Sequence, residues 1–139
     1  MYQIQAEEHF DAAHFLAGYE GKCRNIHGHR WTVVAYAQTE ALCEDKQQRG
    51  MVMDFSELKA GLKKLCDEMD HKLIYEAGSL RPATVAALKE EDFAMVEVSF
   101  RPTAENLAKY FFEQLLSECP QVVKVAVCES PKNIAVYEP

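Results

Sequence analysis

The segment His29-Arg30-Trp31-Thr32-Val33-Val34-Ala35-Tyr36-Ala37 (residues 29–37) is rich in aromatic and β-branched residues, a composition typical of a β-strand. Upstream, residues 2–14 alternate loosely between apolar and polar side chains, with a slip of phase after Ala6 that predicts a β-bulge. A loop containing Gly18 and Gly21 joins the two segments. We therefore expect an antiparallel pair of strands at the start of the chain.

A first helix is predicted after this strand pair. It begins around Met53–Ser56, where Asp54 or Ser56 is the expected N-cap. Apolar residues then recur every three or four positions and form one stripe, which comprises Phe55, Leu58, Leu62, Leu65, Cys66 and Met69. Cys66 is therefore expected in the core.

A second helix is predicted after Pro102, with Thr103 as its N-cap and Glu105 in its first turn. Its inner face comprises Ala104, Leu107, Ala108, Phe111 and Leu115, and Pro120 ends it. Residues 74–101 between the two helices are harder to interpret. They are consistent with a short helix near residues 85–91 and an extended run over residues 95–100.

Two further strands are predicted at residues 122–129 and 134–137, joined by the turn sequence Ser130–Asn133. The whole chain, residues 1–139, then forms one α+β domain of order ββααββ. We expect a four-stranded antiparallel sheet with two helices on one face. Because Val123, Val125 and Val127 alternate with Val122 and Ala126, this strand has apolar residues on both faces, and we expect other subunits to cover the second face.

Composition excludes several classes of function. The chain has 48% hydrophobic and 27% charged residues, which argues against a disordered protein. Its net charge of −7, without a cluster of Lys and Arg, argues against a nucleic-acid partner. No apolar run reaches the roughly 20 residues that span a bilayer, so no membrane partner is expected.

The compartment is expected to be the cytoplasm. Residues 1–8 contain early acids and no apolar stretch of the kind found in a secretory signal. Five cysteines, an odd number without a C-x-x-C pair, favour free thiols in a reducing environment.

Three histidines form the strongest candidate site. His27 and His29 flank Gly28, and in an extended segment residues i and i+2 point to the same face. An antiparallel partner strand would bring His14 beside them. Three imidazoles form a zinc site of the catalytic type, with a fourth position for water or substrate. From spacing alone, unrelated surface or hydrogen-bonded histidines are the alternative.

Three other positions could carry chemistry. Cys23 lies in a loop among cations, which stabilise a thiolate; an ordinary loop cysteine is the alternative, and local evidence favours it. Asp70 precedes His71 at the end of the first helix, where a carboxylate can orient an imidazole; a polar helix terminus is the alternative. Glu129 continues one face of its strand as either an exposed strand end or an acceptor for a ligand's N–H groups.

Taken together, these signals match a known family. The sequence resembles the 6-pyruvoyltetrahydropterin and 6-carboxytetrahydropterin synthases, pterin enzymes of the tunnelling fold. The matching segments occur in the family's order and cover most of the chain. They are residues 10–16 (FDAAHFL), 23–31 (CRNIHGHRW), 53–59 (MDFSELK), 70–73 (DHKL), 102–108 (PTAENLA) and 127–130 (VCES).

The resemblance implies roles for the candidate residues. His14, His27 and His29 would bind one Zn(II) per subunit, Cys23 would be the catalytic base, and Asp70 with His71 would return the proton. The pterin would bind to Glu129, helped by Thr103 and Glu105. The family fold further implies trimers whose sheets close a barrel, stacked into a hexamer with active sites between subunits.

Details of the match favour one activity. The spacing Cys23-x-x-x-His27 resembles the bacterial carboxy synthase of queuosine biosynthesis. The expected reaction converts 7,8-dihydroneopterin triphosphate to 6-carboxy-5,6,7,8-tetrahydropterin; the alternatives are the 6-pyruvoyl product or a binding module without turnover. Two features depart from the family pattern: residues 74–101 are longer than expected, and Arg101 stands where Asn is expected. Candidate triphosphate contacts are Lys22, Arg24, Arg30, Arg101 and Lys132.

Overall fold

A long pair of strands forms the centre of the sheet. The computed structural model describes residues 1–139, and its first two strands are β1 (Tyr2–His14) and β2 (His27–Thr39). They pair antiparallel along their whole length, from Tyr2 opposite Thr39 to His14 opposite His27. The predicted bulge in β1 is wrong, because Ala6, Phe10 and Ala12 keep one phase and the partly buried Glu8 only interrupts their apolar pattern.

The sheet has six strands of mixed direction, and this corrects the expected four-stranded antiparallel sheet. The other strands are β3 (Lys72–Glu76), β4 (Met95–Val98), β5 (Val122–Ser130) and β6 (Asn133–Tyr137), in the order β4-β3-β1-β2-β5-β6. β3 pairs parallel with β1 and with β4, while β5 and β6 continue the sheet antiparallel. A bulge lies between β2 and β5, at Tyr36 and Ala37.

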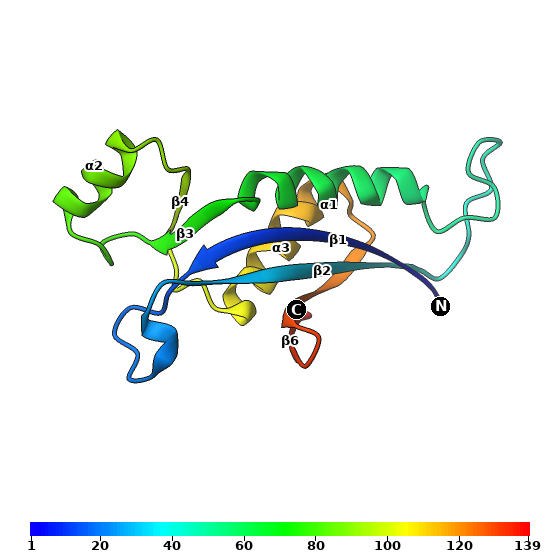
Figure 1. Ribbon diagram of the computed structural model, residues 1–139. Coiled ribbons are helices and arrows are strands. Elements are labelled where there is room, and N and C mark those ends of the chain that lie inside the picture. Colours follow the sequence, from blue (N-terminus) through cyan, green and yellow to red (C-terminus); the bar gives the residue numbers. More distant parts are fainter.

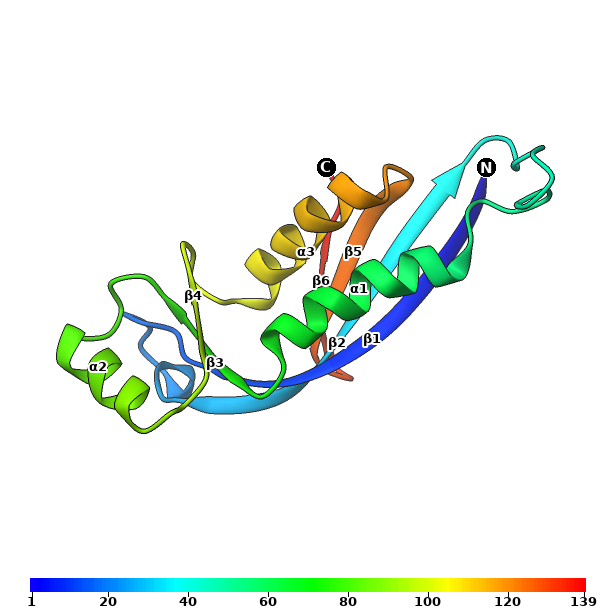
Figure 2. The same ribbon diagram turned by 90° about the horizontal axis from the view of Figure 1, so that it is seen from above.

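Three helices accompany the sheet: the two expected on one face, and a third where a short helix near residues 85–91 was expected. Helices α1 (Phe55–Met69) and α3 (Ala104–Glu118) lie side by side on one face of the curled sheet, and α2 (Pro82–Glu90) stands at its far end (Figures 1 and 2). α2 connects β3 to β4 as the crossover that two parallel strands require. None of the helices combines the length and apolar character needed to cross a bilayer.

The helix caps and the core follow the sequence pattern. Asp54 caps α1 by accepting a hydrogen bond from the Ser56 amide, and Thr103 caps α3 through the Asn106 amide. The core lies between the sheet and the two long helices, where Phe10 stacks on Trp31 and contacts Phe111. Cys66 is fully buried as expected, whereas Phe55 is half exposed because it is the first residue of α1 and extends beyond the core.

Candidate functional site

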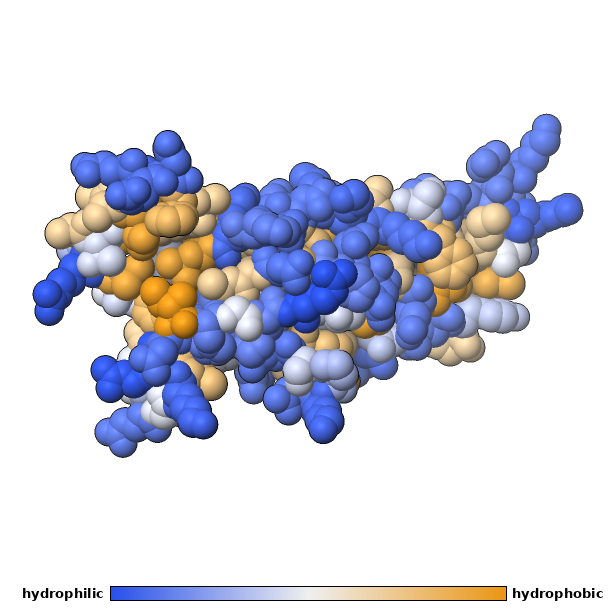
Figure 3. Space-filling model, in the orientation of Figure 1, coloured by the Kyte–Doolittle hydropathy of each residue, from blue (hydrophilic) through white to orange (hydrophobic).

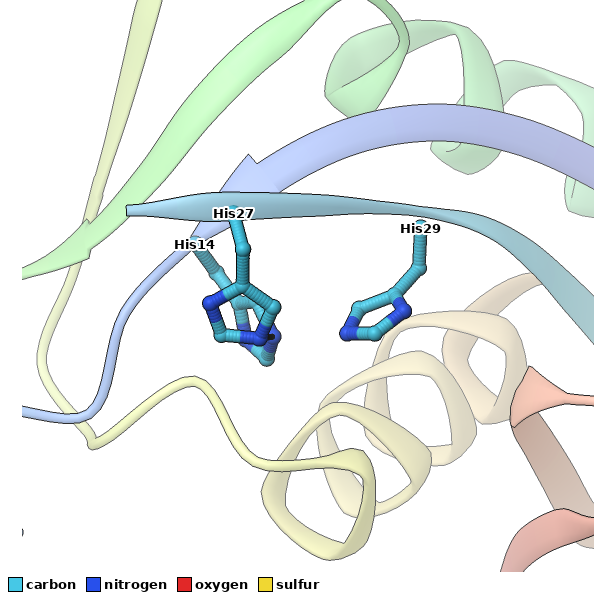
Figure 4. A group of neighbouring side chains, drawn as sticks. All are labelled: His14, His27 and His29. Atoms are coloured by element: carbon cyan, nitrogen blue, oxygen red, sulfur yellow. Dashed lines mark hydrogen bonds between the residues drawn. The ribbon is translucent and has the colours of Figure 1, made fainter. Parts of the chain in front are cut away.

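His14, His27 and His29 project from the paired ends of β1 and β2 toward one point (Figure 4). His14 lies directly opposite His27 in the ladder, and His29 shares a face with His27 because it is two residues further along β2. One ring nitrogen of each histidine lies within 4.8 Å of the other two. The predicted convergence of the three imidazoles is confirmed.

Backbone carbonyls fix the orientation of two of these rings. His14 Nδ1 lies 2.7 Å from the carbonyl oxygen of Pro102, and His27 Nδ1 lies 2.6 Å from that of Asn25. Because a carbonyl oxygen only accepts, each Nδ1 carries a proton and donates it, so Nε2 of the neutral ring presents a lone pair. The two Nε2 atoms are 3.1 Å apart. Two lone pairs repel at this distance, whereas a cation between them would be coordinated by both.

His29 completes the set of donors. Its Nε2 atom is buried and makes no hydrogen bond, although Glu129 Oε1 lies 3.2 Å away. A buried nitrogen without a partner costs free energy, and a metal ion is the partner that suits three convergent imidazoles. Zn–N bonds of about 2.0–2.1 Å in a tetrahedron place the nitrogens about 3.3 Å apart, close to the 3.1 Å between the Nε2 atoms of His14 and His27. The cluster could therefore hold a metal ion.

The protonation states also favour metal binding. Burial lowers the pKa of His14 below its ordinary value and outweighs the opposing effect of the hydrogen bond to Pro102. Burial likewise lowers the pKa of His29, against the opposing charge of Glu129. Both shifts favour the neutral imidazole, which is the form that binds a metal.

Trp31 forms the floor of the cluster. Its side chain is fully buried, and its ring lies edge-on to His14 and His29, with centroid distances of 4.9 and 5.3 Å. The indole Nε1 donates a hydrogen bond of 3.2 Å to the carbonyl of Ala12. The histidines are thus supported by the packed core, which limits their freedom to rotate.

Four other residues of the predicted centre gather in one pocket beside His14. This pocket of about 310 Å³ is lined by the predicted base and all three predicted substrate contacts. Its lining residues include Cys23, Thr103, Glu105 and Glu129. Cys23 is presented by the single helical turn Lys22–Arg24, and Thr103 and Glu105 by the start of α3.

Cys23 is the only one of the five cysteines in this pocket. Cys66 packs in the core, and burial raises the pKa of its thiol to about 12. Burial also raises the pKa of Cys119 and of Cys128. These three thiols are held in the uncharged form, which is a poor base and nucleophile.

Asp70 and His71 directly follow the C-terminal end of α1. Asp70 Oδ2 is 2.8 Å from His71 Nδ1, while Asp70 Oδ1 accepts a hydrogen bond from the amide of Asp11. The Asp11 hydrogen bond is the main reason that the pKa of Asp70 is lowered, followed by the hydrogen bond to His71. The hydrogen bond to Asp70 raises the pKa of His71. The pair has the geometry in which a carboxylate orients an imidazole.

Within one chain, His71 and Cys23 line different pockets. His71 lines a larger pocket, of about 630 Å³, together with Asp11, Ala13 and Arg30. The alternation of β1 and β2 places these three residues on the face opposite to His14 and His29. Figure 3 shows the apolar patch at this end of the molecule, below α2; the pocket's apolar residues there include Leu73, Leu88, Phe93 and Met95.

Comparison with known proteins identifies the family. A family model described as 6-pyruvoyl tetrahydropterin synthase matches residues 3–139. The chain belongs to this family. It is 34% identical, over 99% of both chains, to a Haemophilus influenzae protein named 6-carboxy-5,6,7,8-tetrahydropterin synthase. Such names among the curated relatives support a pterin synthase activity.

Solved structures agree with this assignment. An uncharacterized protein from Wolinella succinogenes superposes with a TM-score of 0.83 at 25% identity, covering 99% of this chain and 97% of that one. The 6-pyruvoyl tetrahydropterin synthase of Caenorhabditis elegans superposes with a TM-score of 0.71 at 27% identity, covering 99% and 95%. The chain therefore has the α+β fold of the pterin synthase family.

The five cations considered for substrate contacts are scattered over this pterin synthase fold. Arg101 lines the pocket of Cys23. Arg30 lines the pocket of His71, where it pairs with Asp11 at 3.3 Å. The other three, Lys22, Arg24 and Lys132, line neither pocket.

Several groups at the family's site were not identified from sequence. The carbonyls of Pro102 and Asn25 orient His14 and His27, and the backbone of Asp11 holds both Asp70 and the amide of His71. A backbone carbonyl has no signature in the sequence, since every residue carries one. Asp11 could have been noticed, because it lies in the matched segment 10–16. Its odd position in β1 places its side chain on the face of the sheet opposite to that of His14.

Proposed function

We propose that the chain is a zinc-dependent 6-carboxy-5,6,7,8-tetrahydropterin synthase. It would convert 7,8-dihydroneopterin triphosphate and one water to 6-carboxytetrahydropterin, with release of acetaldehyde and triphosphate, as a carbon–carbon and carbon–oxygen lyase in queuosine (7-deazaguanine) biosynthesis. One observation carries the proposal: His14 of the imidazole cluster, Cys23 and Glu129 line a single pocket. The name of the Haemophilus influenzae relative and the spacing of Cys23 and His27 support the carboxy product.

The three imidazoles would hold one Zn(II) per chain. Three neutral histidines with an open fourth position suit this ion, and no acidic ligand is required. Bound zinc supplies Lewis-acid polarisation of side-chain hydroxyls. The protein's part is to fix the rings, through the carbonyls of Pro102 and Asn25 and through the floor formed by Trp31.

Cys23 would remove the proton from C1′ of the substrate side chain, and three residues would hold the pterin. Glu129 would accept hydrogen bonds from the 2-amino group and N3–H of the ring, because a carboxylate can accept both. Thr103 and Glu105 line the same pocket as Glu129. The Thr103 hydroxyl accepts from the Asn106 amide, so its own proton is free for donation to a substrate.

His71, oriented by Asp70, would return a proton to the substrate from a neighbouring copy of the chain. The placement of His71 and Cys23 in different pockets supports a shared site, since neither pocket of a single chain holds both groups. The second face of the sheet is also apolar at its edge, where Ile134 and Val136 are 57% and 58% exposed. We propose a homo-oligomer in the cytoplasm, either a trimer or a hexamer built of two trimers.

The decisive experiment is product analysis. Zinc-loaded protein is incubated with 7,8-dihydroneopterin triphosphate, and the products are identified by mass spectrometry. Formation of 6-carboxytetrahydropterin and acetaldehyde supports the proposal. A 6-pyruvoyl product would replace it with the activity for which the Caenorhabditis elegans structure is named. Binding of the pterin without any turnover would identify a binding module instead.

A further inference from the structure

Arg101 lies at the wall of the candidate active site but has no part in the proposed reaction. It is half-buried and is the only Lys or Arg side chain lining the pocket of Cys23. Its position in the fold is between β4 and α3, directly before Pro102. A guanidinium in such a place is desolvated in part, so its hydrogen-bond partners decide what it does.

Those partners belong to the loop that carries Cys23 (residues 15–26, the Cys23 loop). Arg101 Nη2 donates a hydrogen bond of 2.5 Å to the carbonyl of Ala17. The guanidinium carbon also lies 5.9 Å from the centroid of the Tyr19 ring, within the range of a cation–π contact. Between them, Gly18 has a φ of +75°, a left-handed conformation that turns the loop over the guanidinium. One side chain thus contacts two positions of the loop.

Within itself, the Cys23 loop is closed by short-range bonds. The Leu16 amide donates to the carbonyl of Cys23 at 2.8 Å, so the first half of the loop is attached directly to the base. Other bonds of the loop join Tyr19 to Leu16, Arg24 to Gly21 and Asn25 to Lys22. The bond from Arg101 to Ala17 is the only hydrogen bond that connects this loop to a residue beyond the two flanking strands.

The backbone of Arg101 is fixed at the start of α3, next to the imidazole cluster. Its carbonyl accepts hydrogen bonds from the Thr103 amide at 2.8 Å and from Asn106 Nδ2 at 3.0 Å. The next residue, Pro102, supplies the carbonyl that orients His14. The segment 101–103 therefore holds a ring of the imidazole cluster through its backbone and the Cys23 loop through its side chain.

We propose that Arg101 is a positioning residue, which sets the place of Cys23 relative to the imidazole cluster by holding Ala17 and Tyr19. The catalytic consequence rests on the proposed function of Cys23; the structural consequence, a tethered loop, does not. Release of the guanidinium leaves the loop attached only through its two strand ends. Cys23 then samples positions away from the pocket, and groups that must meet within hydrogen-bond distance do so less often.

The test compares Arg101→Met and Arg101→Lys with Arg49→Met, a matched control in the exposed loop before α1. Each zinc-loaded variant is treated with iodoacetamide, and alkylation of Cys23 is followed by mass spectrometry of its peptide. Arg101→Met is expected to raise the rate of alkylation several-fold, and Arg101→Lys less, because lysine keeps the charge without the planar fork. Zinc content and the Arg49→Met rate are expected to match the wild type. An unchanged Cys23 rate in Arg101→Met would overturn the proposal.

A second measurement separates positioning from substrate binding. The kcat for deuterium exchange at C1′ is expected to fall roughly tenfold or more in Arg101→Met, while KM changes little. A loss of this size is typical of one charge-assisted hydrogen bond. A rise in KM for the triphosphate substrate alone, with kcat intact, would make Arg101 a phosphate-binding residue and overturn the proposal. Tyr19→Leu, which removes only the ring, is expected to change alkylation in the same direction by less. If the wild type lacks synthase activity, the proposed function is wrong. The alkylation rates still show whether Arg101 holds the Cys23 loop.

Discussion

The carboxylate of Asp70, at the end of α1, accepts a hydrogen bond of 2.8 Å from the backbone amide of Asp11 in β1. The amide of His71 donates in return to the carbonyl of Asp11 at 2.6 Å, and His71 adopts a φ of +57° to do so. These two bonds clamp the pair of Asp70 and His71 onto the sheet. The imidazole is exposed, but its backbone and its carboxylate partner are fixed, which suits a group that must meet a substrate held elsewhere.

Asp70→Asn is expected to lower the pKa of His71 toward its ordinary value near 6.5, because the hydrogen bond to the carboxylate is the main cause that raises it. In the wild type, the stabilisation from this interaction is present below the ordinary pKa and is lost as the pH rises through the raised pKa. Asp70 has the opposite sign: its lowered pKa stabilises the fold above its ordinary pKa, and this is lost as the pH falls through the lowered value. NMR titration of His71 measures the shift, and Asp67→Asn, on the same helix, is the control. An unchanged His71 titration would contradict the pairing.

His27→Ala is expected to remove most of the bound zinc, since the remaining two imidazoles cannot complete a three-histidine site. Metal analysis of purified protein is expected to give near one equivalent for the wild type. His9→Ala is the matched control, because His9 lies on β1 outside the cluster and contacts Thr32 instead. Full zinc retention by a variant lacking all three cluster histidines would refute the assignment.

Cys23→Ala is expected to keep zinc and pterin binding and to lose proton exchange at C1′. The physical reason is that Cys23 lines the pocket but does not belong to the imidazole cluster, so its removal leaves the metal ligands in place. Cys43→Ala, in the loop between β2 and α1, is the control for removal of a thiol. Undiminished turnover by Cys23→Ala would exclude the role as base.

Mixing two inactive variants tests whether the site is shared between chains. Cys23→Ala and His71→Ala are unfolded together and refolded at equal ratio, and light scattering is expected to show a trimer or a hexamer. Random assortment places an intact Cys23 opposite an intact His71 at roughly a quarter of the interfaces, so about that share of activity is expected to return. No recovery in mixed oligomers, or a fully active monomer, would place the complete site within one chain.

The fold could be predicted wherever a local residue pattern was consistent with only one type of secondary structure. The stripes of α1 and α3, their caps Asp54 and Thr103, and the strands β1, β2, β5 and β6 all follow from local spacing. The parallel strands β3 and β4 were missed as members of the sheet because they have only five and four residues. Strands this short carry little periodicity, and their direction depends on the crossovers formed by α1 and α2.

The same distinction applies to the candidate site: features that follow from periodic patterns could be predicted, and the others could not. The cluster of His14, His27 and His29 could be anticipated because strand pairing and alternation are periodic properties of the sequence. The tether of Arg101 to Ala17 could not, since it joins a side chain to a backbone carbonyl 84 residues away. Cys23 and His71 line different pockets. This placement could not be predicted, because it depends on the order and register of all the strands.

Glu129→Gln is the change that best separates a pterin pocket from a generic zinc hydrolase. Glu129 lies on the pocket wall, and its carboxylate is 3.2 Å from His29 Nε2, so it faces the centre and is not an exposed strand end. A carboxylate accepts from both the 2-amino group and N3–H of a pterin, whereas glutamine places an N–H₂ against one of these donors.

That clash of donors in a half-buried pocket should cost roughly 1–3 kcal/mol. Pterin affinity is therefore expected to fall by about tenfold to more than a hundredfold, at a factor of ten for each 1.4 kcal/mol. Zinc content is expected to stay constant, because the three imidazoles and their carbonyl partners are untouched. Calorimetric titration with sepiapterin or biopterin measures the affinity, and Glu138→Gln, at the exposed C-terminus, is the control. If Glu129→Gln binds pterin as tightly as the wild type, the pterin ring lies elsewhere and the carboxylate serves the imidazole cluster alone.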